Sequence, residues 1–439
     1  MQEPEQQVYT DDSVENGIVL AHVICTYRRE DAVQRKLDLL SPLTSDSYFI
    51  IVIDNGETLD ERDAEGVTVI RSPNFGGSAG FARGMMEAIK RGATHILLND
   101  DDAELETSGL LRTFDFLRHL KPEFKDICIS GIMLDAANPN TVYEAGAQVR
   151  NGEIIPLKNG IDITDEKQML ALSSQERIDY ANWTFLCLPV HLVKEHGLPL
   201  PFFFREDDVE YGLRLSARTI TLPGVYVKHP TYTSSYRPVN YYYYVRNRLI
   251  ALCCSGDVDE TVFGRFFDEM ALEASAYRYL SCEEMILGME DFLKGPDYVY
   301  GLCMHGMHKA PGIATDDLDT LRKGLNLIPE APKEDFFKRR KSLNGVFRSP
   351  AGDLETTPFD MDSAHFYRIG KVLYRTGKDE GFIAERSRSK AISYAARITL
   401  LRRKAMKALP ALQRQYRGTR DYYSSFGFWE RMFYQEVKE

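Results

Sequence analysis

Four apolar runs separated by helical stretches occupy the first hundred residues, and they constrain the fold more than any other feature. The runs cover residues 17–25, 48–53, 67–70 and 95–98. Two of the intervening segments, Asp31–Leu40 and Gly80–Arg91, have the residue pattern of helices. Buried strands that alternate with helices are typical of a mainly parallel sheet. We therefore predict an α/β fold for the first half of the chain.

Polar clusters follow three of these predicted strands. They are the segments 26–29 (TYRR), 54–55 (DN) and 100–102 (DDD). Parallel α/β sheets bind their ligands beyond the carboxyl ends of the strands. The sequence therefore predicts a binding site at this edge of the sheet.

The Asp100–Asp102 run is the most distinctive of the three clusters. Successive carboxylates repel one another unless water or a divalent cation compensates for their charge. Side chains alternate along a strand, so an Asp-x-Asp pair can point toward one place. A solvated acidic turn that caps the next helix is the alternative interpretation.

A glycine-rich segment, residues 74–84 (NFGGSAGFARG), precedes the second predicted helix. Free N–H groups at a helix N-terminus suit a phosphate, and Arg83 could add a bidentate contact. A tight connection without a ligand remains the alternative. Further along, Asp207 and Asp208 follow an apolar run and begin a helix, where a carboxylate stays ionised and could act as a general base. The alternative role for this pair is helix capping.

His229 ends another β-rich run, and a lone histidine is either a metal ligand or a partly buried polar residue. In their order and spacing, eight segments resemble one family. They read CTYRR, IDNG, NFGGSAGFARG, NDDDA, YANWTFLCLP, FFFREDDVEYGLR, LPGVYVKH and YYYYVRNRL. Together they resemble inverting glycosyltransferases of the A-type fold, similar to family 2, and most of all the bacterial galactofuranosyltransferases that extend cell-wall galactan. The match spans about residues 19–249.

The resemblance implies a Rossmann-like A-type sheet and a set of residue roles. The donor nucleotide sugar would contact Thr26, Arg29 and Asn55 at the uridine, and Arg83, Asp100 and Asp101 at the ribose and pyrophosphate. A divalent metal, Mn²⁺ or Mg²⁺, would be bound by Asp102 and His229. The catalytic base would be Asp208, and the acceptor would contact Asp207, Trp183 and Arg205. Arg246 and Asn247 would close the site from the following segment.

The expected function is thus a metal-dependent transfer of a sugar, with inversion, to a lipid-linked or polysaccharide acceptor in cell-surface glycan synthesis. UDP-galactofuranose is the expected donor. A rhamnosyltransferase that uses dTDP-rhamnose shares many of these motifs and stays open. So does a non-catalytic nucleotide- or glycan-binding protein of the same fold. A nucleotidyltransferase is less favoured, because a basic GxGTR-like loop is absent from the N-terminal part.

We expect an N-terminal extension over residues 1–17, a catalytic domain over 18–250 and a mostly helical domain over 251–439 that is a candidate for self-association. The net charge of -11 argues against nucleic acid as a partner. Residues 386–420 nevertheless contain eleven Lys and Arg and no acidic residue. A basic amphipathic helix there could lie on an anionic membrane surface, although a solvated helix face is the alternative. With no apparent signal peptide or spanning segment, we expect a cytoplasmic protein bound peripherally to the inner face of the cell membrane.

Overall fold

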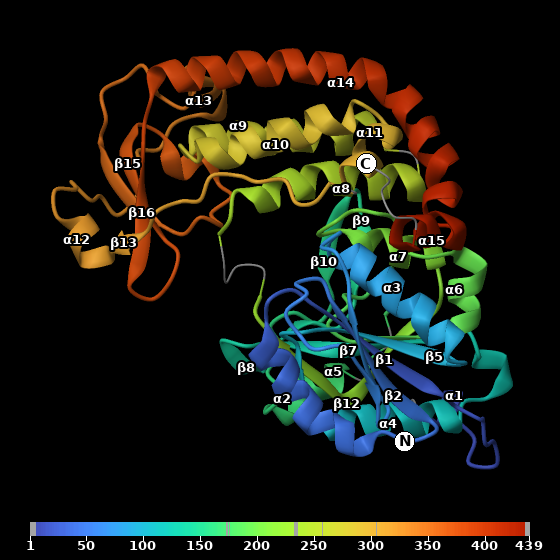
Figure 1. The fold of residues 1–439 in the computed structure, drawn as a ribbon. Coiled ribbons are helices and arrows are strands. Elements are labelled where there is room, and N and C mark those ends of the chain that lie inside the picture. Colours follow the sequence, from blue (N-terminus) through green and yellow to red (C-terminus); the bar gives the residue numbers. More distant parts are fainter. Residues whose placement is uncertain are drawn as a thin grey trace. The chain divides into compact units, whose positions relative to one another are not determined.

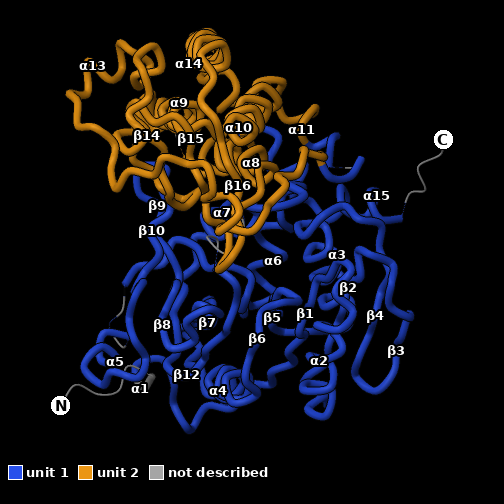
Figure 2. The backbone as a smooth tube through the Cα atoms, turned by 90° about the vertical axis from the view of Figure 1, so that its left-hand side faces the viewer, with its two compact units in different colours: residues 1–231, 300–307, 417–439 blue, residues 232–299, 308–416 orange. Residues whose placement is uncertain are grey.

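The computed structural model describes residues 6–172, 174, 176–231, 236–256, 258–303 and 305–434 (Figure 1). They belong to two compact units, which Figure 2 separates by colour. Unit 1 contains residues 1–231, 300–307 and 417–439, and unit 2 contains residues 232–299 and 308–416. The chain first leaves unit 1 after residue 231 and later returns to it, whereas the sequence predicted a single boundary near residue 250.

Unit 1 is built on a sheet whose described strands number ten. Their order is β3–β4–β2–β1–β5–β11–β7–β12–β6, and β8 pairs with β7 outside this path. The strands are β1 (Leu20–Thr26), β2 (Tyr48–Asp54), β3 (Arg62–Ala64), β4 (Val67–Arg71), β5 (His95–Asp100), β6 (Glu104–Leu105), β7 (Cys128–Asp135), β8 (Asn138–Glu144), β11 (Leu186–Pro189) and β12 (Thr219–His229). Strands β4, β2, β1 and β5 are parallel, as are β7 and β12. The predicted mainly parallel α/β sheet is confirmed. A separate hairpin is formed by β9 (Ala147–Arg150) and β10 (Glu153–Pro156).

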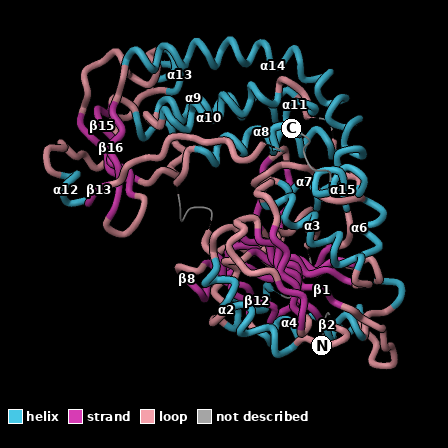
Figure 3. Tube along the Cα trace, in the orientation of Figure 1, coloured by secondary structure: helices cyan, strands magenta, loops and turns pink. Residues whose placement is uncertain are grey.

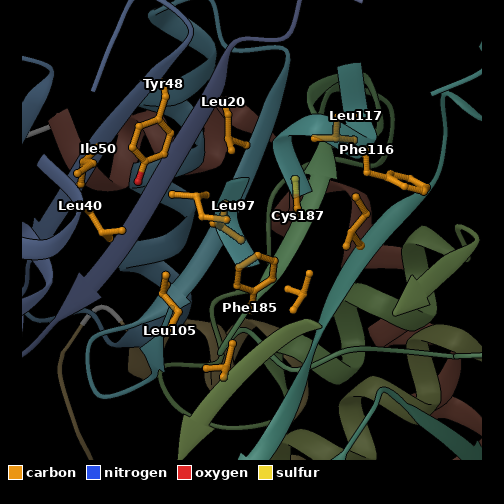
Figure 4. Packing of buried hydrophobic residues seen from close by; sticks show 14 of the residues in the cluster. Leu20, Leu40, Tyr48, Ile50, Leu97, Leu105, Phe116, Leu117, Phe185 and Cys187 are labelled. Carbon is orange, nitrogen blue, oxygen red and sulfur yellow. The ribbon is translucent and has the colours of Figure 1, made fainter. Parts of the chain in front are cut away.

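Helices cover both faces of this sheet. They are α1 (Gln6–Tyr9), α2 (Glu30–Leu40), α3 (Gly77–Lys90), α4 (Thr107–Arg118), α5 (Glu166–Leu172), α6 (Val190–His196), α7 (Asp207–Leu215) and α15 (Phe426–Tyr434). Successive residues of β1 point to opposite faces, as a pleated strand requires. Ile24 packs in the cluster that includes residues of α2 and α4, and Val23 packs in the cluster that includes residues of α3, α6 and α15. Figure 4 shows part of the first cluster, with Leu20, Leu97 and Phe185 close together.

The aromatic C-terminal segment packs into the core of unit 1. Trp429 of α15 is fully buried, and its indole N–H donates a hydrogen bond of 3.0 Å to the carbonyl of Pro199. Phe428 and Met432 are also buried in the cluster that covers α3. The sequence alone left open whether these aromatic residues contact the core or a membrane interface. In the structure they contribute to the core.

Unit 2 combines long helices with a small sheet, as the colours of Figure 3 show. Its helices are α8 (Val239–Ser255), α9 (Glu260–Ser275), α10 (Tyr279–Phe292), α12 (Leu318–Arg322), α13 (Phe336–Lys341) and most of α14 (Arg388–Tyr423); α11 (Pro296–Cys303) begins in unit 2 and ends in unit 1. The predicted helical character of the C-terminal part is confirmed. The sheet, ordered β13–β16–β15–β14, was not anticipated. Its strands are β13 (Asp316–Asp317), β14 (Gly352–Thr356), β15 (Ile369–Arg375) and β16 (Glu380–Glu385).

Within the described ranges, every helix falls short of the length and apolar character needed to cross a lipid bilayer.

Candidate functional site

The polar strand ends meet at one edge of the sheet, as the sequence predicts. Thr26 pairs in register with Asp54, and Cys25 pairs with Asp100, because β1 runs parallel to both neighbours. His229 ends β12, which runs parallel to β7. The carboxyl ends of parallel strands lie on the same edge, so side chains distant in sequence converge there.

Asp100, Asp102 and His229 form a cluster with the composition of a metal site. One ligand atom from each residue can be chosen so that all three lie within 4.8 Å of one another. The Nε2 atom of His229 lies 3.0 Å from a carboxylate oxygen of Asp102. The Nδ1 atom of His229 is buried and has no hydrogen-bond partner among the described residues. Two carboxylates and an imidazole suit a divalent cation such as Mn²⁺ or Mg²⁺, so these residues fit the expected metal.

Charge pairing sets the protonation of Asp102 and His229. Burial alone would raise the pKa of Asp102, but its contacts with His229 and Arg29 hold the pKa well below the usual range. Burial lowers the pKa of His229, and the neighbouring carboxylates of Asp102 and Asp100 outweigh that effect and raise it. For Asp100, burial dominates and raises the pKa to about 7. A cation placed here would face at least one firmly ionised carboxylate.

Thr26, the last residue of β1, and Arg29, in the loop that follows, contact the acidic turn. The hydroxyl of Thr26 donates a hydrogen bond of 2.8 Å to Asp101, and the guanidinium of Arg29 donates one to Asp102. Arg29 also lies 3.5 Å from a carboxylate oxygen of Asp101. The side chain of Arg29 is 49% exposed. It can therefore move without repacking the core.

Lys36 supports the acidic turn from inside the protein, and sequence reasoning missed it. The residue lies on α2, is 7% exposed, and donates hydrogen bonds to the side chain of Asn99 and to the carbonyl of Asp100. Burial lowers the pKa of Lys36 to about 8, although the nearby acidic residues oppose this shift. The available signal was the spacing of Lys36, three residues after Val33 and four before Leu40, which places it on the apolar side of the helix. It was not decisive, because only the folded chain brings residue 36 to residue 100.

The candidate base, Asp208, lies at the start of α7, directly after a loop with a strained backbone. Phe203, Arg205 and Glu206 have φ values of 70°, 64° and 68°, which non-glycine residues rarely adopt. The hydroxyl of Ser78 donates a hydrogen bond of 2.8 Å to Asp207. Burial raises the pKa of Asp207 to about 6, and burial with the charge of Asp207 raises that of Asp208 well above its ordinary value.

Another buried carboxyl, on Glu144, lies close to this pair and was also missed by sequence reasoning. Glu144 ends β8 and accepts a hydrogen bond of 2.7 Å from the side-chain amide of Asn182. Burial raises the pKa of Glu144 to about 7. Its charge contributes to the raised pKa of Asp208. The site therefore concentrates negative charge around the candidate base.

The glycines of the 74–84 segment permit close packing. A Cβ atom on Gly76 would lie 2.0 Å from the carbonyl oxygen of Phe203, and one on Gly80 would lie 2.2 Å from the sulfur of Cys25. Gly76 thus lets this loop contact the loop that precedes Asp207, and Gly80 lets α3 approach β1. The tight-connection interpretation accounts for both positions.

Arg83 is not brought to the cluster. Its guanidinium lies over the rings of Phe433 and Tyr434, at 5.5 and 4.3 Å from their centroids. Ser78, on the same helix, contacts Asp207. A residue five positions along an α-helix is rotated by about 140°, so Arg83 leaves from another side of α3. The expected contact of Arg83 with the donor pyrophosphate is therefore not supported by its position.

The remaining expected site residues occupy varied environments. Asn55 is buried and donates a hydrogen bond to the carbonyl of Gly76, while its side-chain oxygen lacks a partner among the described residues. Trp183 is 4% exposed and packs edge-on against Phe81, which makes it a core residue here rather than an open wall. Arg205 is partly exposed and lies over the ring of Phe204.

Arg246 and Asn247 belong to unit 2 and are buried in α8. The side chain of Arg246 donates hydrogen bonds to Asn247 and to the hydroxyl of Tyr242. It also stacks on the rings of Tyr242 and Tyr243. These contacts give the tyrosine-rich segment a structural role inside unit 2.

The chain is similar in sequence to known glycosyltransferases. No protein-family model matches the chain. It is 26% identical to the galactofuranosyltransferase GlfT2 of Mycolicibacterium smegmatis over 362 residues, which cover 74% of this chain and 54% of the relative. It is 27% identical to GlfT2 of Mycobacterium tuberculosis over 259 residues, 52% of this chain and 39% of the relative. The chain thus spans about half or less of the length of these relatives.

A shorter match involves the galactofuranosyltransferase GlfT1 of Mycobacterium tuberculosis, with 35% identity over 99 residues, 21% of this chain and 33% of the relative. Among solved structures, TarS of S. aureus (residues 1–349) is 14% identical, covers 66% of this chain and 83% of its own, and has a TM-score of 0.41. A mannosyltransferase from Pyrobaculum calidifontis, solved with GDP-Man and Mn²⁺, is 13% identical, with coverages of 55% and 65% and a TM-score of 0.37. The sequence matches, rather than these partial superpositions, confirm that the chain is similar to galactofuranosyltransferases.

Proposed function

We propose that this chain is a metal-dependent, inverting glycosyltransferase that moves galactofuranose from UDP-galactofuranose to a lipid-linked or polysaccharide acceptor. The observation that carries the proposal is the convergence of Asp100, Asp102 and His229 at the sheet edge, beside the Asp207–Asp208 pair. The two groups are close enough for the charge of Asp207 to raise the pKa of Asp100. The similarity to galactofuranosyltransferases supports the choice of donor.

In the proposed reaction, the acceptor hydroxyl oxygen attacks the anomeric carbon of the donor sugar while the bond to the diphosphate oxygen breaks. Asp208 takes the proton of that hydroxyl, and Asp207 orients the acceptor with Arg205. Attack from the side opposite the diphosphate inverts the anomeric configuration. A divalent cation bound by Asp102 and His229 would neutralise the negative charge of the departing diphosphate. Thr26, Arg29 and Asn55 would hold the uridine, with Asp100 and Asp101 at the ribose and pyrophosphate.

The raised pKa values of Asp207 and Asp208 suit this mechanism. A base must be ionised to accept a proton, and its catalytic efficiency is greatest when its pKa lies near the working pH. Burial keeps the pair from titrating at the acid pH of ordinary carboxyls. The proposed enzyme would therefore lose activity as the pH falls through the raised pKa of the pair.

The first test is the release of UDP or dTDP from a panel of nucleotide sugars, with and without Mn²⁺ and a soluble galactose-containing acceptor. Metal-dependent turnover of UDP-galactofuranose supports the proposed reaction and its donor. Turnover of dTDP-rhamnose instead would replace the donor and keep the mechanism. Pyrophosphate release would indicate a nucleotidyltransferase. Donor binding with no turnover, for every acceptor tried, would favour the binding-protein alternative.

We also propose that α14 carries the cationic contact with an anionic inner membrane surface, where a lipid-linked acceptor would be found. Its apolar stripe, including Ile398, Leu401 and Leu409, is buried in the protein. These residues therefore cannot insert into a membrane as the apolar face of an amphipathic helix does. The exposed cations Arg403, Lys404 and Lys407 remain available for electrostatic attraction to anionic lipid. The test is binding to phosphatidylserine-containing vesicles. Reversing these three charges to Glu should abolish it, and unchanged binding would refute this role of α14.

A deletion is a poor substitute for those substitutions. Removing the chain after residue 385 would also remove Trp429, which is fully buried in unit 1. A lost function could then reflect unfolding. Charge reversal on exposed positions leaves the core unchanged.

A further inference from the structure

A second membrane-binding feature of unit 2 is the short helix α13 with the turn that follows it. We infer that Phe336 and Phe337 of α13 insert into an anionic lipid surface and supply the apolar part of the proposed membrane contact. This inference builds on that contact and is independent of the transfer reaction. It concerns a segment, FFKRRK, to which the sequence analysis and the comparisons assign no role.

The two phenylalanines are exposed although they are large and apolar. Phe336 is 54% and Phe337 is 68% exposed, and their rings pack edge-on against each other at 5.6 Å. Phe347, at the end of the following turn, is 52% exposed. Single exposed apolar residues are common on proteins, but a pair in contact at the start of a helix is a localised apolar patch.

Cations surround this patch. Residues 333–348 contain six Lys and Arg and two acidic residues, in a chain whose net charge is -11. Glu334 pairs with Lys338 and Arg348, at 3.4 and 3.3 Å. Asp335 accepts hydrogen bonds from the backbone at the start of α13. The two acidic side chains are therefore engaged locally, and Lys338, whose side chain is 67% exposed, still faces solvent beside the aromatic pair.

The patch is held in place by the rest of unit 2. Val346 is 2% exposed, and the amide of Asn344 donates a hydrogen bond of 2.9 Å to the carbonyl of Ser363. The backbone of α13 continues into this turn through hydrogen bonds from residues 342 and 344 to residues 338 and 339. The phenylalanines are thus presented on an ordered support, so that inserting them costs little additional ordering.

Charge complementarity selects an anionic lipid surface as the occupant. Electrostatic attraction alone gives a weak contact, and stable peripheral binding usually takes an apolar anchor together with a basic cluster. In Figures 1 and 2, α14 runs along the outer side of α9 and α10, and α13 lies near the N-terminal part of α14. Part of the apolar stripe of α14 is buried, and Ile392 and Leu400 are exposed singly among its cations. The aromatic pair of α13 adds a localised apolar anchor to these cations.

The test compares full-length variants in co-sedimentation with vesicles of phosphatidylcholine, with and without phosphatidylserine. Phe336→Ser with Phe337→Ser should weaken binding to the anionic vesicles by about tenfold or more, since two apolar side chains no longer leave water. The matched control is Met361→Ser. Met361 is 57% exposed and lies between Asp360 and Asp362, so it should not approach an anionic surface. Equal binding of the double variant and the wild type would overturn the inference.

Insertion itself is measured with Phe337→Trp. The two native tryptophans, Trp183 and Trp429, are buried, so the new indole reports the change. Its emission should shift to the blue on anionic vesicles and be quenched by brominated lipid. Vesicle binding without either change would overturn the inference in favour of a contact at the lipid surface. Binding to polyglutamate that is lost in the Phe336→Ser, Phe337→Ser variant would overturn it in favour of an acidic protein partner. Turnover of a soluble acceptor should be unchanged in these variants, which separates this outcome from failure of the proposed reaction.

Discussion

Two pairs of acidic side chains at the same sheet edge differ in what neutralises them. Asp101 and Asp102 face the cationic Arg29, and Asp102 also contacts His229. Asp207 accepts a hydrogen bond from the hydroxyl of Ser78 and Asp208 accepts one from the backbone N–H of Val209, and both carboxyls are largely removed from water. The pKa of Asp102 is accordingly depressed, and the pKa values of Asp207 and Asp208 are raised. One residue type thus has different proton affinities at two places, because the environment decides them, and these affinities match what the proposed metal ligand and the proposed base each require.

The strongest way to break this comparison is Asp208→Asn. It removes the proposed base while keeping the shape of the side chain. We expect transfer to fall by about 10²–10⁴-fold, with donor binding largely intact. The measurement is UDP release in parallel with calorimetric titration of the donor. Near-normal turnover would show that Asp208 is not the base.

The same variant tests the stability side of the comparison. A carboxyl whose pKa is raised in the folded state destabilises the fold once it ionises, so this cost appears as the pH rises through the folded pKa. Asp208→Asn should therefore unfold at a higher temperature than the wild type near pH 8, and at a similar temperature near pH 4. Asp46→Asn, at an exposed position, is the control and should change neither value.

Asp102→Ala tests the opposite member of the comparison. The proposal predicts a loss of Mn²⁺ affinity of about 100-fold or more, because one of the few protein ligands is removed. Direct metal titration of the donor-free protein checks this without relying on turnover. The control is Asp135→Ala, at the end of neighbouring β7, which should leave the Mn²⁺ affinity unchanged. Retained metal binding in Asp102→Ala would exclude the proposed ligand.

Arg29→Ala should change the affinity for Mn²⁺ by less than Asp102→Ala, and the direction of the change is informative. Arg29 contacts the carboxylate that would bind the metal, so in the donor-free protein it competes with the cation. Its removal should strengthen Mn²⁺ binding several-fold and weaken binding of the UDP-sugar. The outcome contrary to this would be weaker metal binding in the variant, which would show that Arg29 organises the site instead of competing for it.

The smallest expected effect comes from Ser78→Ala. The hydrogen bond from Ser78 lowers the pKa of Asp207 against the effect of burial. Without it, the pKa of Asp207 rises further, and the acid limb of the pH–rate profile should move to higher pH. Ser108→Ala, which removes a hydroxyl near an exposed glutamate, serves as the control. If the acid limb does not move, the hydrogen bond from Ser78 has no influence on the ionisation of Asp207 and Asp208 that controls activity.

Much of the site could be predicted from local sequence, because each motif sits at the end of a recognisable strand or at the start of a helix. Asp208 illustrates this at a helix start. The joint role of Asp102 and His229 was implied by the family resemblance, and in the structure the antiparallel pairing of β6 with β12, with Glu104 opposite Lys228, brings them together. Lys36 and Glu144 could not be found in this way. Their importance depends on contacts with residues 64 and 38 positions away, which have no local sequence signature.

Arg83 shows the opposite limitation. The motif that contains it is local and distinctive, but the direction of its side chain depends on the rotation of α3 against β1, which Gly80 and Gly84 set by their close approach to Cys25 and Val23. The apolar stripe of α14 is a similar case. Its spacing indicated an amphipathic helix, and whether the apolar face met protein or lipid depended on the neighbours available in unit 2.

By itself, the sequence determined the α/β class, the edge of the sheet that carries the polar side chains, and the residue types gathered there, because apolar periodicity and chain direction are local properties. The tertiary structure alone decided which carboxylates lie beside cations and which are desolvated beside other carboxyls. It also decided that the C-terminal tryptophan belongs to the core of unit 1 and that two phenylalanines of α13 remain exposed. Protonation and exposure depend on neighbours that only folding brings together, and for this reason the local sequence does not determine them.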